Sequence, residues 1–159
     1  MSDPAGRGEV PREAKCPMAR DPRPAGRGHA DREPPVVILA EDDDELRRLL
    51  TMKLARRGCT VLAAHNGMEL ARLIVDRALG PNARGGAEVV ISDVRMPGIT
   101  GLEIVTMLRQ VDWVLPVILI TGFGDVATHA EAARLGVRLF DKPVDLDVLV
   151  EEACLSLGL

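Results

Sequence analysis

The chain has 159 residues, of which 47% are hydrophobic and 28% charged, and its formal net charge is −4. This length is enough for one compact domain with a core and too short for two ordinary ones. The acidic balance argues against binding nucleic acid through this domain, and three widely separated cysteines fit neither a disulfide framework nor paired metal ligands.

No apolar stretch approaches the ~18 residues of a membrane-spanning helix. The N-terminus lacks the apolar segment of a signal peptide. We therefore expect a cytoplasmic protein that makes no contact with a membrane.

Residues 1–35 differ in composition from the rest of the chain. They hold seven of the 11 prolines and four of the 15 glycines, without apolar periodicity. Such a segment buries too little apolar surface to offset the entropy of ordering it. We predict a disordered tail at 1–35 and a folded domain at 36–159. A tail that binds a partner, or a true translation start at Met18, are the alternatives.

From residue 36, short β-branched runs alternate with stretches of helical spacing. The runs predict strands at Val36–Ala40, Thr60–Ala64, Val89–Ser92, Val117–Thr121 and Val137–Phe140. Five strands alternating with helices predict an α/β fold with a parallel, doubly wound sheet and helices on both faces. The flavodoxin-like strand order 2-1-3-4-5 is the expected arrangement.

The helices are predicted from apolar stripes and capping residues. A first helix buries the stripe Leu46, Leu49, Leu50 and Leu54. Asn66, Thr100 and Asp125 cap helices that reach about Leu79, Gln110 and Leu135. The last helix starts after Asp145 and places Leu146, Leu149, Val150, Ala153 and Leu157 on one side, with Val148 and Leu155 off that stripe.

Polar side chains stand at the carboxyl ends of these predicted strands. Glu41 and Asp42 follow the first strand, and Asp93 follows the third. Thr121 ends the fourth strand, and Lys142 follows the fifth. In the order 2-1-3-4-5 the first and third strands are neighbours, and ligands gather at this edge of such sheets. We therefore expect three carboxylates beside a hydroxyl and an ammonium group.

Carboxylates a few ångströms apart repel one another by ~1 kcal/mol per pair in water, and a divalent cation removes this repulsion. Oxygen-only ligation suits Mg²⁺, while no His or Cys lies near enough in these motifs to suggest zinc. Beside Mg²⁺, an aspartate can act as nucleophile toward a phosphoryl group, and a lysine and a hydroxyl can hold the oxygens on which charge develops. The sequence therefore predicts Asp93 as a phosphate acceptor.

Four segments together, ILAEDD, ISDVRMPGITG, VILITGFGD and FDKP, resemble the receiver domain of bacterial two-component response regulators, of the single-domain kind found in chemotaxis. The resemblance runs from about Val36 to the C-terminus. It implies that Asp93 accepts phosphate from a histidine kinase or a histidine phosphotransfer protein. It also implies that Mg²⁺ is held by Glu41, Asp42, Asp93 and the backbone carbonyl of Arg95.

By the same resemblance, Thr121 and Lys142 contact the phosphoryl group, and the side chains of Arg95 and Phe123 border the site and influence how fast phosphate is lost. Gly122 leaves room for the phosphodonor. A downstream protein would bind the face formed by the fourth helix, fifth strand and fifth helix. We expect a phosphorelay component that assists its own phosphorylation and dephosphorylation, is no enzyme with separate turnover, and has no direct nucleic-acid partner.

One position departs from the family pattern. Receivers commonly carry Phe or Tyr three residues before the active lysine, but this chain has Leu139 there and Phe140 one residue later. Because side chains alternate across a strand, that offset places Phe140 on the opposite face.

Two other functions stay open. Leu139 favours a phosphate-independent interaction domain. The carboxylate cluster also suits a Mg²⁺-dependent phosphatase with an aspartyl intermediate, which would need a general acid or base near Asp93. His65 and His129 lie outside the cluster, and we expect solvated side chains there.

Overall fold

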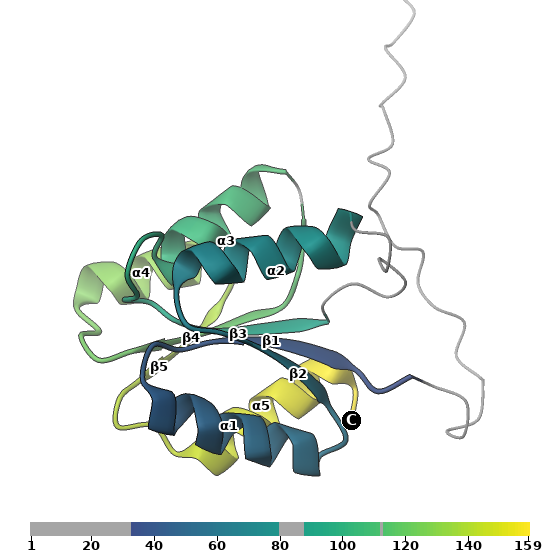
Figure 1. Cartoon of the computed structure of the whole chain (residues 1–159). Coiled ribbons are helices and arrows are strands. Elements are labelled where there is room, and N and C mark those ends of the chain that lie inside the picture. Colours follow the sequence, from purple (N-terminus) through teal and green to yellow (C-terminus); the bar gives the residue numbers. More distant parts are fainter. Residues whose placement is uncertain (1–32, 80–87, 112) are drawn as a thin grey trace, which may run out of the picture. The chain divides into compact units, whose positions relative to one another are not determined.

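The computed structural model describes residues 33–79, 88–111 and 113–159. Within these ranges the strands form one parallel sheet of order β2-β1-β3-β4-β5, as predicted (Figure 1). The strands are β1 (Val36–Ala40), β2 (Thr60–Ala64), β3 (Val89–Asp93), β4 (Val117–Thr121) and β5 (Arg138–Asp141). Residues 1–32 of the predicted tail lie outside the described residues.

Helices cover both faces of this sheet. The described helices are α1 (Asp44–Arg56), α2 (Gly67–Leu79), α3 (Gly101–Gln110), α4 (Val126–Arg134) and α5 (Leu146–Leu157). Figure 1 shows α2, α3 and α4 on one face and α1 and α5 on the other. The predicted α/β fold, doubly wound and flavodoxin-like, is therefore confirmed.

The helices begin where capping side chains satisfy free backbone N–H groups. Thr100 and Glu103 form a reciprocal capping box at the start of α3. Asp125 accepts from the backbone N–H of Thr128, and Asp145 caps α5 in the same manner. These caps set the direction in which each helix leaves the strand ends, and so fix the loops that carry the polar cluster.

Each face of the sheet buries its own apolar cluster. Along β1, Val37 and Leu39 pack toward α1 and α5, whereas Ile38 and Ala40 pack toward α2 and α3. All residues of β3 and β4 are buried, which explains the continuous apolar runs Val89–Ile91 and Val117–Ile120 that precede the polar strand ends. Burial of a Leu or Ile side chain stabilises the fold by roughly 1.5–3 kcal/mol.

Three details differ from the prediction. Leu49 is 38% exposed, because the buried stripe of α1 is narrower and consists of Leu50 and Leu54. Strand β3 extends to Asp93 itself, and β5 spans Arg138–Asp141 rather than Val137–Phe140. The acceptor candidate is thus the last residue of its strand, held by the ladder to β4.

Leu139 and Phe140 point to opposite faces of β5. Leu139 packs against the cluster under α2, α3 and α4, and Phe140 packs against the cluster under α1 and α5. The expected one-residue offset is confirmed. Among the described residues, none of the helices has both the length and the apolar character needed to span a bilayer.

Candidate functional site

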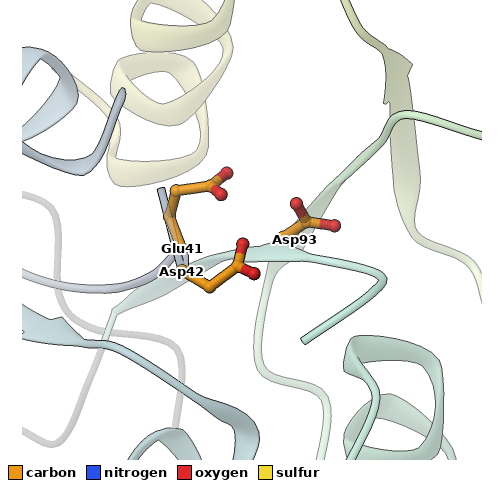
Figure 2. Close-up of side chains that lie close together, drawn as sticks. All are labelled: Glu41, Asp42 and Asp93. Atoms are coloured by element: carbon orange, nitrogen blue, oxygen red, sulfur yellow. The ribbon is translucent and has the colours of Figure 1, made fainter. Parts of the chain in front are cut away.

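Three carboxylates converge at the carboxyl edge of the sheet (Figure 2). Glu41 and Asp42 follow β1, and Asp93 ends β3, the strand that pairs with β1. One oxygen from each carboxylate lies within 4.8 Å of the others. Glu41 is fully buried and Asp93 is 5% exposed, whereas Asp42 faces solvent. The adjacency of β1 and β3 therefore brings together the residues that the sequence predicted.

Lys142 reaches this cluster from the end of β5. Its Nζ lies 2.5 Å from Oδ2 of Asp93, and 3.1 and 3.3 Å from the two carboxylate oxygens of Glu41. The backbone N–H of Lys142 donates to the carbonyl of Thr121 at 2.7 Å, which ties it to the end of β4. The lysine thus sits between two carboxylates that come from different strands.

Burial and pairing shift the pKa of both partners. Burial raises the pKa of Glu41 above its ordinary 4.5, and hydrogen bonds from the Asp43 N–H and Lys142 offset this only in part. Burial also opposes protonation of Lys142, but hydrogen bonds to Asp93 and Glu41 outweigh it and raise the pKa of this lysine above 10.5. Lys142 is therefore a permanent cation at neutral pH.

The loop after β3 fixes the orientation of Asp93. Its Oδ1 accepts from the backbone N–H of Arg95 at 2.8 Å, while Oδ2 accepts from Lys142. The backbone N–H of Val94 continues the ladder to the Ile120 carbonyl at 2.8 Å. Both oxygens of the carboxylate are thus hydrogen-bonded. The role of the Arg95 carbonyl as a metal ligand stays a prediction.

Thr121 lies at the end of β4, buried beside the strand of Asp93. Its Oγ1 accepts from the backbone N–H of Phe123 at 3.2 Å, which leaves the hydroxyl hydrogen available to another acceptor. The Arg95 guanidinium carbon lies 4.9 Å from the centre of the Phe123 ring, and this ring is 68% exposed. A cation–π contact therefore joins the two loops that border the cluster.

The donor set fits Mg²⁺. All ligand candidates are oxygens, and three carboxyl groups lie around one ammonium group. Mg²⁺ prefers this chemistry and uses few carboxylates, with water and phosphate oxygens completing its shell. Glu41, Asp42 and Asp93 are thus the side chains that would hold it.

Arg47 belongs to this site, and the sequence analysis did not single it out. Its side chain is only 11% exposed, and its Nη1 donates to the Glu41 carbonyl at 2.7 Å. Its Nη2 pairs with the carboxylate of Asp44, whose pKa this hydrogen bond lowers. The available signal was the spacing of three between Asp44 and Arg47, which places them on neighbouring turns of one helix face.

His129 was expected to be solvated, and it is 44% exposed at the side chain. It nevertheless has a partner, since its Nε2 lies 3.1 Å from the carboxylate of Asp141, the residue before Lys142. Gly124 runs alongside, where a Cβ would lie 1.9 Å from Oδ1 of Asp141. Sequence spacing alone does not predict this contact, because it joins two separate elements.

Comparisons with known proteins agree with this geometry. Residues 37–153 match the family model of the response regulator receiver domain. The chain is 40% identical over 116 residues to the C4-dicarboxylate transport transcriptional regulatory protein DctD of Pseudomonas aeruginosa, covering 72% of this chain and 23% of DctD. It is 30% identical over 115 residues to the uncharacterized transcriptional regulatory protein YkoG of Bacillus subtilis, covering 72% of this chain and 47% of YkoG.

The chain therefore spans between about a quarter and a half of the length of these curated relatives. Among solved structures, the response regulator receiver protein from Pseudomonas putida superposes with a TM-score of 0.62 at 31% identity. That superposition covers 74% of this chain and 93% of the other. Sequence and fold thus lead to the same family.

Proposed function

Because the chain belongs to the response regulator receiver domain family, we propose that it is a phosphorylation switch whose Asp93 accepts a phosphoryl group from a histidine kinase or histidine phosphotransfer protein. The observation that supports this role is the position of Asp93. Its carboxylate lies in a cluster with Glu41 and Asp42 and contacts Lys142 at 2.5 Å. A nucleophile, a cation for the phosphoryl oxygens and a candidate metal site meet at one point.

In the proposed transfer, a carboxylate oxygen of Asp93 attacks the phosphorus of a phosphohistidine. A P–O bond forms, the P–N bond breaks, and the departing imidazole keeps the electron pair and takes a proton from solvent. Lys142 compensates charge on the transferred oxygens, and the Thr121 hydroxyl donates a hydrogen bond to one of them. When bound, Mg²⁺ would supply further positive charge beside these oxygens. We propose that the domain turns over no separate substrate.

We propose further that phosphorylation changes a protein-binding face formed by α4, β5 and α5. Val148 and Leu155 on α5 are 54% and 63% exposed, off the buried stripe as predicted. DctD and YkoG are named as transcriptional regulators. Those names give no support to the prediction that nucleic acid is not a partner, so the proposal is limited to a protein partner.

Phosphoryl uptake from a small-molecule donor tests the acceptor assignment. We expect the intact mass to rise by one phosphoryl group in Mg²⁺ and to stay unchanged in EDTA or in Asp93→Asn. Asp145→Asn is the matched control, because asparagine caps α5 as well as aspartate does. Labelling that survives Asp93→Asn, or that ignores chelation, contradicts the assignment. Absence of labelling in the wild type favours a phosphate-independent interaction domain.

Amide exchange with and without a phosphate analogue tests the output face. A switch requires that the analogue favours one arrangement of this face over another. We expect altered protection in α4, β5 or α5. Changes confined to the loops around Asp93 would instead indicate a domain that holds phosphate without switching.

A further inference from the structure

Arg47 closes the segment between β1 and α1 into a ring of hydrogen bonds. Its backbone N–H donates to the Asp43 carbonyl at 2.9 Å, and its Nη1 donates to the Glu41 carbonyl at 2.7 Å. Its Nη2 pairs with Asp44. Arg47 therefore contacts Glu41, which precedes Asp42, and Asp43 and Asp44, which follow it, through both backbone and side chain.

The contact with Glu41 bears directly on Asp42. The carbonyl of Glu41 and the N–H of Asp42 share one planar peptide unit. A hydrogen bond that holds this carbonyl therefore also holds the Cα atom from which the Asp42 side chain extends. Glu41 is restrained at its other atoms, because its N–H donates to the Ala64 carbonyl at 3.2 Å and its carboxylate accepts from the Asp43 N–H and Lys142.

Asp42 differs from the other two carboxylates of the cluster. Glu41 and Asp93 are buried and held by Lys142, whereas Asp42 is exposed. Its distance to the others, within 4.8 Å, thus depends on the backbone that carries it. Neighbouring carboxylates repel each other, so in the absence of a cation Asp42 gains by turning away.

We propose that Arg47 is a positioning residue for the metal site: it holds the Glu41–Asp42 peptide so that the Asp42 carboxylate faces those of Glu41 and Asp93. The inference rests on the proposed function, because it concerns the Mg²⁺ that the acidic cluster would bind. Arg47 is not a ligand and touches neither metal nor phosphoryl group. Outer contacts of this kind orient metal ligands, and their loss typically costs 10- to 100-fold in metal affinity.

The charge of Arg47 predicts the opposite effect. A guanidinium cation near three carboxylates repels Mg²⁺, so its removal by charge alone should tighten metal binding. Positioning predicts weaker binding on removal. Substitution by lysine separates the two effects. Lysine keeps the positive charge but lacks the planar guanidinium group whose two nitrogens contact the Glu41 carbonyl and Asp44. The sign of the change in Mg²⁺ affinity thus distinguishes a positioning role from a purely electrostatic one.

Calorimetric titration with Mg²⁺ alone tests this inference on the full chain. We expect the Kd for Mg²⁺ to rise ~10-fold in both Arg47→Lys and Arg47→Met. Arg48→Met is the matched control, because Arg48 is the neighbouring exposed arginine, and its Kd should stay within about twofold of the wild type. Unfolding in EDTA verifies that each variant is folded. Should Arg47→Met fail to fold, Arg47→Lys alone decides.

Amide exchange supplies a second readout that does not depend on metal. The Asp43 N–H, which donates to Oε1 of Glu41, should exchange faster in Arg47→Lys than in the wild type. Unchanged or tighter Mg²⁺ binding in the Arg47 variants, with normal binding by the wild type, overturns the positioning role alone. A wild type that binds no Mg²⁺ overturns the metal role in the proposed function and this inference with it.

Discussion

His129 on α4 contacts Asp141 at the end of β5, with Nε2 of the histidine 3.1 Å from the carboxylate. Asp141 directly precedes Lys142, whose Nζ contacts Asp93. The chain thus connects α4 to the phosphate-acceptor candidate through three residues. This connection lies on the side of β5 where Leu139 occupies the position that is commonly aromatic in the family. The polar contact between His129 and Asp141 therefore links α4 to the site in a chain that has Leu139 in place of the usual aromatic residue.

We predict that His129→Ala loosens α4 without unfolding the domain. The contact is half-exposed, so its loss should lower the free energy of unfolding by less than ~1 kcal/mol. Amide exchange in Val126–Arg134 should become faster in the unphosphorylated protein. His65→Ala is the control, because His65 makes a similar exposed contact with Glu69, which belongs to α2 and not to α4. Equal amide exchange of Val126–Arg134 in the two variants would contradict a specific role for His129.

We predict that Asp42→Asn stabilises the metal-free protein while weakening Mg²⁺ binding. The substitution removes a negative charge beside Glu41 and Asp93, and each such repulsion amounts to ~1 kcal/mol or less in a solvated position. Urea denaturation in EDTA and Mg²⁺ calorimetry measure the two effects. Asp43→Asn is the control, because it removes a neighbouring charge and keeps the cap of α1. A loss of stability in Asp42→Asn would show that its carboxylate makes a favourable contact.

The raised pKa of Glu41 predicts a pH dependence of stability in EDTA. A carboxyl group whose pKa is higher in the folded state contributes stability that is fully present below its ordinary pKa of 4.5 and is lost as pH rises through the raised value. Glu41→Gln should therefore gain stability relative to the wild type as pH rises above 4.5. Exposed carboxyl groups with lowered pKa values, such as Asp125 and Glu131, follow the opposite trend in both proteins and cancel in the difference.

The measurement is the free energy of unfolding of wild type and Glu41→Gln at several pH values in EDTA. Mg²⁺ should reduce the difference, because a cation compensates the buried charge. A difference that does not change with pH would show that Glu41 has the same proton affinity in the folded and unfolded chain.

We predict that Gly67→Ala destabilises the domain by roughly 1–3 kcal/mol, the range typical of overpacking. A Cβ at Gly67 would lie 1.8 Å from the backbone oxygen of Ile99, so the start of α2 or the loop before α3 has to move. Gly122→Ala is the control for stability, since the atom nearest to its Cβ is Cδ of Lys142 at 4.0 Å. Equal denaturation midpoints in the two variants would exclude this close approach.

The strand ends were predictable because local signals coincide there. The apolar run Val89–Ile91 is followed shortly by the carboxylate of Asp93. A parallel sheet places the carboxyl ends of its strands at one edge, so the convergence of Glu41, Asp42 and Asp93 follows from the strand order. Lys142 was predictable for the same reason. The caps at Thr100, Asp125 and Asp145 also follow from local chemistry.

Other features depend on contacts between distant segments, which periodicity does not encode. Leu49 follows Leu46 at the helical spacing of three, yet its exposure is decided by how α1 lies on the sheet. The sequence gives no reason to expect more than a solvated side chain at Arg47, because its contact with the Glu41 carbonyl depends on how the loop between β1 and α1 folds. The same holds for His129, whose partner Asp141 belongs to another element.

Strand β5 is one of the two edge strands of the sheet and has only four residues. Both of its ends carry charged side chains that are tied to neighbouring helices: Arg138 donates to Glu152 at 2.8 and 3.0 Å, and Asp141 contacts His129. Short edges with charged ends resist the addition of a further strand from another chain. We therefore expect that a partner docking on this face would recognise side chains of α4 and α5, and that this edge of the sheet resists edge-to-edge aggregation.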